Sequence, residues 1–192
     1  RVRRQRQMCI RDRFGISYEV YNASAKYISY LLTPATVCLA VPLYEQLELL
    51  KKNKVAVVCG ILSGTLASLT GIFVLCMLFG FNHQQYVTML PKSITTAIGI
   101  GISEELGGIV TITVAVIIIT GILGNVIADT VFHIFKIKNP LAKGLALGTA
   151  SHAIGTARAI EMGPVEGAMS SLAVAVAGLL TVVFVSGFAQ LI

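Results

Sequence analysis

The stretch IVTITVAVIIITGILGNVIADTVFHIF, residues 109–135, decides the fold class of this 192-residue chain. It is the most apolar part of the sequence, and its main interruptions, Asn125 and Asp129, come late in the run. About 20 apolar helical residues cross a bilayer core of roughly 30 Å. The stretch therefore predicts a membrane-spanning helix.

The composition of the whole chain agrees with this prediction. Hydrophobic residues make up 55% of it and charged residues 12%, whereas an ordinary soluble domain has about 25% charged residues. So few charges do not coat a soluble surface. We expect an all-α, polytopic transmembrane protein without a soluble domain.

Apolar runs continue on both sides of this stretch. Two of them, from Val55 to Phe79 and from about Val165 to Ile192, predict plain spans. A run from Ala142 to Met162 is richer in small and hydroxylated residues. Another, from Tyr27 to about Leu50, contains two residues that remove backbone donors and are expected to kink or break the helix, Pro34 and Pro42.

The stretch from Val87 to Gly108 is too polar for a plain lipid-facing helix, since it contains a proline, a lysine, two glutamates and four glycines. It either re-enters the membrane or crosses it as a broken span. Short basic loops favour the cytoplasm, and lysines cluster at residues 51–54 and 136–143. A re-entrant stretch places both clusters on the cytoplasmic side, and we favour it. The preceding GFNHQQY segment is then an outside loop.

Residues 1–13, RVRRQRQMCIRDR, differ abruptly in composition from the rest. Six of the 15 basic residues and one of the nine acidic residues lie there, which leaves nine basic and eight acidic residues in the remaining chain. The net charge of +6 thus belongs to one tip, and we expect no nucleic-acid binding. We interpret the tip as non-native, with an Arg-rich cytoplasmic flank as the alternative, and residues 14–192 as a single transmembrane domain.

No residues have the spacing of a catalytic triad, a phosphate-binding loop or a metal site. The four cysteines show no CxxC pattern, and three of them lie in apolar runs. We therefore predict no enzymatic activity, no catalytic residues, no metal and no cofactor.

A short internal similarity indicates an inverted repeat. Leu32–Leu43 aligns with the segment around Gly148 so that Ala35-Thr36 lies over Ala150-Ser151. In the favoured topology these two segments run in opposite directions. Transporters use such pairs of broken helices because the free N–H groups of half-helices, which face a cavity rather than lipid, bind anions. The arrangement suits a small carboxylate.

Polar residues inside the apolar runs are the candidate site, because they are costly in lipid unless they are used. Arg158 and Lys92 are the candidate carboxylate ligands, although a lysine near a segment end also reaches the interface. His152, beside Ser151, is explained equally well by substrate binding and by a contact with a neighbouring helix. Further substrate contacts are expected at Thr36, Thr95, Thr96 and Thr156. Broken-helix hinges are expected at Pro34, Pro42, Pro91, Gly148 and Gly155, and a proton or ion relay at Asp129, Glu104 and Glu161.

Four segments in order, LLTPATVCLAVPLYEQ, LPKSITTAIGI, GTASHAIGTARAIE and GAMSSLA, resemble the LrgB/CidB/YohK family of bacterial membrane proteins. The resemblance covers residues 15–192 and departs from the family at Ala97, where a proline is expected. Family members begin with further membrane helices, so the resemblance implies that this chain lacks its native N-terminal helices.

The resemblance implies two different functions. One is transport of small monocarboxylates such as pyruvate or glycolate, for which our own hypothesis is that Arg158 holds the carboxylate and His152 and Ser151 orient it. The other is antiholin-like control of murein hydrolase activity, autolysis and programmed cell death. Both imply a multi-pass protein of the bacterial inner membrane that works with a small LrgA/CidA-like membrane partner, and we expect a homo-oligomer. Transport is the leading hypothesis, because interior Arg and His residues are costly without a use.

Overall fold

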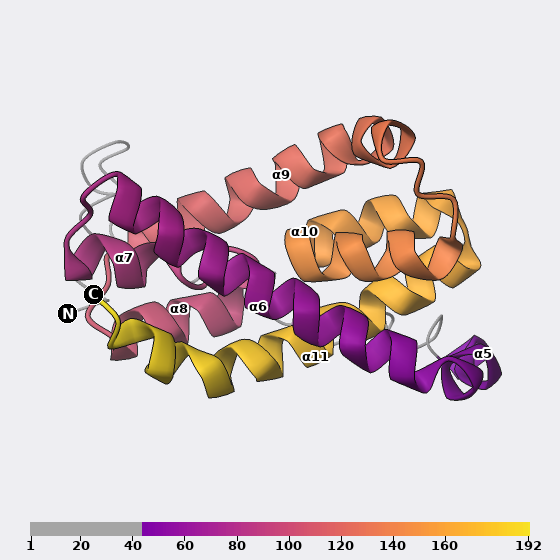
Figure 1. Ribbon diagram of the computed structural model, residues 1–192, viewed down its shortest axis with the longest axis horizontal. Coiled ribbons are helices and arrows are strands. Elements are labelled where there is room, and N and C mark those ends of the chain that lie inside the picture. Colours follow the sequence, from indigo (N-terminus) through magenta and orange to yellow (C-terminus); the bar gives the residue numbers. More distant parts are fainter. Residues whose placement is uncertain (1–43) are drawn as a thin grey trace, which may run out of the picture. The chain divides into compact units, whose positions relative to one another are not determined.

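The computed structural model describes residues 44–192, which lie within one compact unit formed by residues 40–192. Every regular element in this part of the chain is an α-helix, as predicted (Figure 1). Several predictions concern residues outside the described part: the basic tip at residues 1–13, Thr36, the hinges Pro34 and Pro42, and the repeat segment Leu32–Leu43.

Three long helices form the frame: α6 (Lys54–Leu78), α9 (Val110–Ile134) and α11 (Pro164–Ala189). Each is long and apolar enough to cross a membrane, which confirms a polytopic transmembrane protein. Apolar side chains face outward along α9, where Ile119 is 54% and Val126 is 71% exposed. Such a surface suits lipid rather than water.

A short helix, α5 (Leu47–Lys52), precedes α6 and is separated from it by Asn53. The Asn53 side chain donates to the Leu49 carbonyl over 2.9 Å. The helix therefore ends at Lys52, two residues after the predicted end of the run near Leu50.

Two short helices, α7 (His83–Met89) and α8 (Thr96–Glu105), form a helical hairpin, called hairpin 1 (Figure 1). At its open end, Gln84 Nε2 donates to the Gly107 carbonyl over 3.4 Å, and the Ile109 amide donates to Thr88 Oγ1 over 2.8 Å. The hairpin thus starts and finishes at the same end of the frame, beside the end of α6 and the beginning of α9. This is the re-entrant arrangement that the sequence favours.

Helix α7 begins earlier than predicted. The Asn82 side chain accepts from the Gln85 amide over 2.9 Å, and the Gln85 side chain accepts from the Asn82 amide over 3.0 Å. This reciprocal capping box satisfies backbone donors at the helix start. The prediction of a loop is therefore wrong for the second half of GFNHQQY.

Helix α10 (Pro140–Met162) forms a second hairpin, called hairpin 2, because its backbone breaks at His152, with φ 44° and ψ −139°. A positive φ is strained for a residue with a Cβ. The break lies between the predicted hinges Gly148 and Gly155, and the predicted hinge Pro91 lies in the turn of hairpin 1.

The second half of hairpin 2 returns along α9. Asn125 Nδ2 donates to the Ile154 carbonyl over 3.3 Å, and one turn further along both helices Asp129 pairs with Arg158. Hairpin 2 therefore enters and leaves beside the end of α9, opposite to the end that hairpin 1 uses.

The two hairpins share sequence and geometry. Ala97-Ile98-Gly99 follows the turn of hairpin 1, and Ala153-Ile154-Gly155 follows the break of hairpin 2. A Cβ on the first glycine would lie 3.5 Å from the Pro91 carbonyl oxygen, and one on the second 2.7 Å from that of Leu147, the same distance back along the chain. Because α6 with hairpin 1 and α9 with hairpin 2 run in opposite directions, the described residues contain an inverted repeat. Its halves differ from the pair that the sequence similarity indicated.

Small residues bring α10 and α11 together. A Cβ on Gly148 would lie 2.5 Å from the Ser170 carbonyl oxygen and 2.7 Å from the Ala173 Cβ, and Gly144 lies equally close to Glu166. A cluster of buried apolar side chains from α6, α10 and α11 continues this contact, Val57, Ile61, Leu145, Ala168, Met169, Ala173 and Ala177. Hairpin 2 is therefore packed rigidly against the frame on one side.

Cysteine labelling tests the re-entrant arrangement. Gln84 and Glu105 are exposed at the open end of hairpin 1, and Lys138 is exposed at the opposite end of α9. In a background without native cysteines, we expect Gln84→Cys and Glu105→Cys to react with a membrane-impermeant maleimide from one side, and Lys138→Cys from the other. Labelling of the two hairpin 1 positions from different sides would contradict the fold.

Candidate functional site

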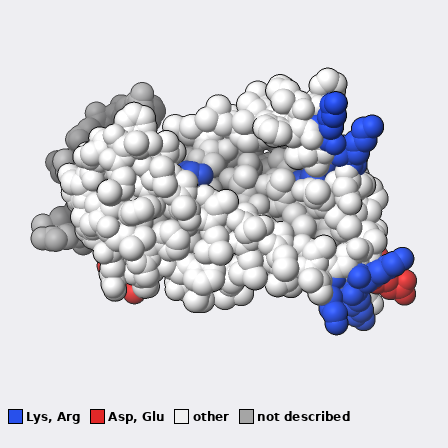
Figure 2. Space-filling model, in the orientation of Figure 1, with Lys and Arg blue, Asp and Glu red and all other residues white. Residues whose placement is uncertain are grey.

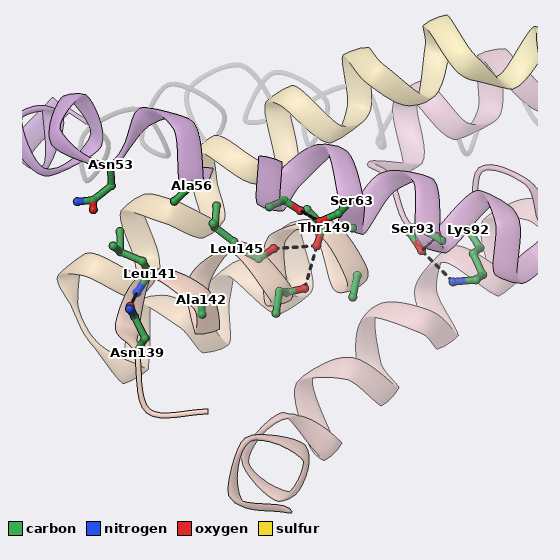
Figure 3. A pocket seen from close by; sticks show the side chains of 15 residues that line it. Asn53, Ala56, Ser63, Lys92, Ser93, Asn139, Leu141, Ala142, Leu145 and Thr149 are labelled. Carbon is green, nitrogen blue, oxygen red and sulfur yellow. Dashed lines mark hydrogen bonds between the residues drawn. The ribbon is translucent and has the colours of Figure 1, made fainter. Parts of the chain in front are cut away.

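A cleft of about 650 Å³ lies between α6 and the first half of α10. One end of it lies at Asn53 and Asn139, and the other end reaches Lys92 and Ser93 in the turn of hairpin 1 (Figure 3). Figure 2 shows this face as hollowed, with basic atoms recessed in the hollow, away from the basic side chains gathered at one end of the molecule. The cleft thus leads from the lysine-rich end to the turn of hairpin 1.

Glycines on α6 set the width of the cleft. A Cβ on Gly64 would lie 2.9 Å from Thr149 Oγ1, and one on Gly60 would lie 3.1 Å from Leu145 Cδ1. These two glycines, four residues apart on one face of α6, therefore allow the helix to pack closely against α10. Because both glycines also line the cleft, this contact forms part of its wall.

Lys92 is the charged group of the cleft. Its Nζ donates to Ser93 Oγ over 2.9 Å, and Ser68 Oγ of α6 donates to the same oxygen over 2.9 Å. Among residues 44–192 no carboxylate lies within ion-pair distance of Lys92. Lys92 is half-buried, and an ammonium partly removed from water attracts an anion more strongly because a lower local dielectric screens the charge less.

Hydrogen bonds tie hairpin 1 to α9 on its other side. Thr113 Oγ1 donates to the Thr88 carbonyl over 2.9 Å and bonds to Ser103 Oγ over 2.8 Å. All three hydroxyl-bearing residues are buried. The inverted counterpart of the cleft, between α9 and hairpin 1, is therefore closed in this structure.

Three predicted substrate ligands of hairpin 2 are buried and do not line the cleft: Ser151, His152 and Thr156. His152 Nε2 donates to the Ile117 carbonyl over 2.9 Å, since a carbonyl can only accept. Thr156 Oγ1 donates to the His152 carbonyl over 3.0 Å and lies 2.9 Å from Ser170 Oγ. These contacts hold the break of hairpin 2 against its neighbours, which is the structural role that the sequence left open for His152.

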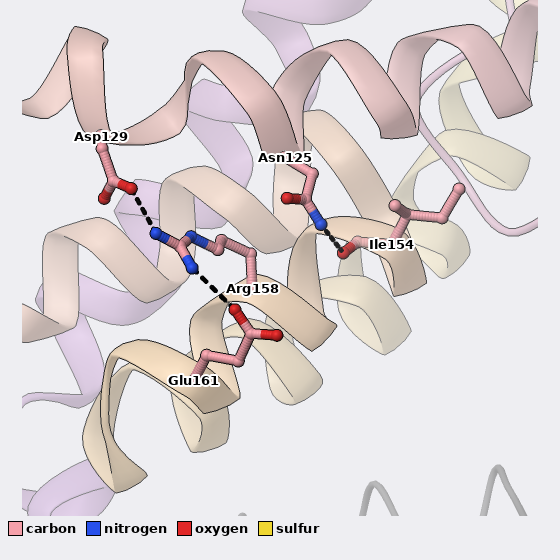
Figure 4. Close-up of polar contacts among 5 residues, drawn as sticks. All are labelled: Asn125, Asp129, Ile154, Arg158 and Glu161. Carbon is pink, nitrogen blue, oxygen red and sulfur yellow. Dashed lines mark hydrogen bonds and ion pairs between the residues drawn. The ribbon is translucent and has the colours of Figure 1, made fainter.

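Arg158 does not line the cleft either. Its guanidinium donates to Glu161 Oε2 over 2.7 Å and pairs with Asp129 Oδ2 of α9 (Figure 4). The Asp129 and Glu161 side chains are 62% and 66% exposed. The structure thus joins one predicted carboxylate ligand to two of the predicted relay residues, in a surface ion-pair cluster.

The remaining predicted residues lie around the turn and the end of hairpin 1. Thr95 is the N-cap of α8 but makes no side-chain cap hydrogen bond, and Thr96 is the first residue of that helix. Both are half-buried, and neither lines the cleft. Glu104 is exposed near the end of α8. The free N–H groups at the start of α8 add partial positive charge close to Lys92.

Four hydroxyl residues of the cleft were not predicted as ligands: Ser68, Ser63, Ser93 and Thr149. A signal for the first was present, because Gly60, Gly64 and Ser68 recur at helical spacing and form one small-residue face of α6. Ser93 follows Lys92 directly. Thr149 could be predicted only from the path of hairpin 2, which the sequence did not reveal.

Comparison of the sequence with known proteins identifies relatives of this chain. The model of the LrgB-like family matches residues 7–191. The antiholin-like protein LrgB of Bacillus cereus (strain B4264) is 42% identical over 174 residues, which cover 91% of this chain and 76% of that protein. The antiholin-like protein LrgB of Bacillus anthracis (strain CDC 684) shows the same identity and coverage. No solved structure matches the chain.

Proposed function

Since the chain belongs to the LrgB-like family, we propose that it is a secondary transporter of small monocarboxylates, such as pyruvate or glycolate, without enzymatic activity. One observation carries the proposal: Lys92 stands at the inner end of a cleft, and no carboxylate among residues 44–192 pairs with it. A charge inside a membrane protein is costly and marks a functional path. A bound carboxylate supplies the missing counterion.

The surroundings of Lys92 suit a small substrate. Hydroxyl groups of Ser68, Ser93 and Thr149 line the same cleft. Ser93 Oγ accepts in both of its hydrogen bonds and keeps a hydrogen for a carboxylate oxygen, whereas Ser68 and Thr149 can accept from the hydroxyl of a 2-hydroxy acid. The other walls are formed mainly by glycine and alanine, which leave room for a short carbon chain. Lys92 therefore replaces Arg158 as our carboxylate ligand, because the Arg158 guanidinium already has two partners.

The inverted repeat supplies a route for alternating access. The lysine-rich end is cytoplasmic by the positive-inside rule, so the cleft faces the cytoplasm of a bacterial cell with the protein in its inner membrane. Outward opening requires the Thr88–Thr113 contact between hairpin 1 and α9 to part while the cleft between α6 and hairpin 2 closes. We propose this exchange as the transport cycle.

The alternative function is antiholin-like control of murein hydrolases, autolysis and cell death, and the printed names of the relatives favour it. In both cases we propose assembly with an LrgA/CidA-like membrane protein and with further copies of this chain. A glycine-rich helix face is a common site for the packing of a partner helix. The face of α10 with Gly144 and Gly148 is already buried against α11, so a partner has to bind elsewhere.

Uptake of labelled pyruvate and glycolate into proteoliposomes tests the proposal, with the protein reconstituted alone and with its LrgA-like partner. We expect saturable uptake that unlabelled pyruvate suppresses. Absence of uptake in both preparations, together with a normal effect on lysis in cells, would establish the alternative function instead.

The variant Arg158→Gln tests which of the two residues that the sequence predicted, Arg158 or Lys92, binds the carboxylate of the substrate. We expect this variant to keep pyruvate uptake within about threefold of the wild type, because exposed ion pairs contribute little. Asp129→Asn removes the same pair from the other side and is the matched control. A complete loss of uptake in Arg158→Gln but not in Asp129→Asn would show that Arg158, and not Lys92, binds the carboxylate of the substrate.

A further inference from the structure

A second, smaller cavity of about 10 Å³ lies beside the inner end of the cleft. Ser68, Ser93 and Thr149 line both spaces, and the cavity continues to Thr65 of α6 and Thr181 of α11. About 10 to 15 Å³ is the space that one water-sized particle needs. The cavity therefore holds a single small particle, reached from the cleft where the proposed carboxylate binds.

The hydroxyl group of Thr65 indicates that the cavity is occupied in the working protein. Its side chain is 3% exposed, and its Oγ1 is buried without a hydrogen-bond partner. It is the one buried side-chain oxygen or nitrogen in the described residues that lacks a partner. Such an atom costs about 1–3 kcal/mol unless it meets a ligand.

The other hydroxyls present lone pairs rather than hydrogens. Thr149 Oγ1 donates its hydrogen to the Leu145 carbonyl over 2.8 Å, and Thr181 Oγ1 donates to the Ala177 carbonyl over 2.7 Å. Ser68 Oγ donates to Ser93 Oγ. Since a hydroxyl has only one hydrogen, these three oxygens can only accept toward the cavity.

We propose that the cavity binds one sodium ion, held by the hydroxyl oxygens of Thr65, Ser68, Thr149 and Thr181. A water molecule has two hydrogens and cannot donate to all three oxygens that only accept, whereas a cation contacts all three and the Thr65 oxygen as well. Divalent cations prefer carboxylate ligands, and the described residues contain no group of acidic, His or Cys side chains that could hold a metal. Sodium is the smaller of the two common monovalent cations, and a cavity of about 10 Å³ has room for it.

The position of the site couples sodium to the carboxylate, and this step rests on the proposed function. Ser93 Oγ, which accepts from Lys92, also lines the cavity, so the ammonium lies one hydroxyl away from the sodium position. An unpaired Lys92 repels the cation, and a bound carboxylate cancels this repulsion. Each ligand therefore raises the affinity of the other by the same factor.

Thermal unfolding of the purified protein tests the sodium site without transport. We expect sodium chloride to raise the unfolding temperature saturably over choline chloride at equal ionic strength. Thr65→Val should weaken the apparent sodium affinity about tenfold or more, while in choline it unfolds at the same or a higher temperature, because it removes an unpaired hydroxyl. Thr70→Val, at an exposed position of the same helix, is the control that should keep the sodium effect.

Equal stabilisation by choline and sodium, or an undiminished sodium effect in Thr65→Val, would overturn the proposal. The cavity would then hold a water molecule and no sodium ion. Adding pyruvate separates this result from the proposed function. Pyruvate binding by a protein that sodium does not stabilise removes the sodium site and keeps the carboxylate transporter. A sodium effect that pyruvate does not change keeps the site and removes the coupling.

Discussion

Lys92→Met abolishes pyruvate uptake in our account, with a loss of roughly 100-fold or more at low substrate concentration. The substitution keeps the length of the side chain and removes the charge that pairs with the carboxylate. Because a charge within a membrane protein costs roughly 2.5–3.5 kcal/mol, the variant should also be more stable than the wild type in the absence of substrate. Proteoliposome uptake and thermal unfolding of the same preparation measure the two effects.

The combination of lost uptake and raised stability distinguishes a ligand from a structural residue. Lys92→Arg is the conservative control, which should restore part of the uptake because it restores the charge without the geometry of an ammonium. A variant Lys92→Met that transports normally, or that loses uptake only because it unfolds, would remove Lys92 from the site.

Gly148→Leu is expected to destabilise the protein by more than about 3 kcal/mol. A Cβ at this position would lie 2.5 Å from the Ser170 carbonyl oxygen, which is backbone and cannot move aside easily. The leucine side chain would then force hairpin 2 away from α11 and disturb the wall that Thr149 contributes to the cleft. Thermal unfolding in detergent measures the loss.

Gly71→Ala provides the matched control for this prediction. No atom outside the local helix lies within 4 Å of a Cβ built on Gly71. Replacing a glycine inside a helix by alanine stabilises it by about 0.5–1 kcal/mol. Equal effects of Gly148→Leu and Gly71→Ala would show that the contact between α10 and α11 is not as close as the structure has it.

The spans could be predicted because lipid demands long apolar helices. The run of residues 109–135 becomes α9, Val110–Ile134. The polar stretch from Val87 to Gly108 becomes the end of α7, the turn and α8 of a re-entrant hairpin. The break at His152 could not be predicted in the same way. Glycine and proline are the expected hinge residues, whereas this break is held by a tertiary bond to the Ile117 carbonyl.

The candidate site was predicted in part. Lys92 was named as a ligand from its cost in a membrane, but the sequence ranked Arg158 above it because a lysine near a segment end can also reach the interface. The two residues differ in their partners: Asp129 and Glu161 neutralise Arg158, and no described carboxylate reaches Lys92. Pairing across helices depends on tertiary contacts, which a single sequence does not show.

Calorimetric titration of the purified protein with pyruvate tests most directly that a carboxylate binds at Lys92. We expect saturable binding that glycolate competes with and that pyruvamide, the uncharged analogue, does not. In Lys92→Met we expect no binding of pyruvate. Equal competition by pyruvamide, or unchanged pyruvate binding in Lys92→Met, would contradict the account.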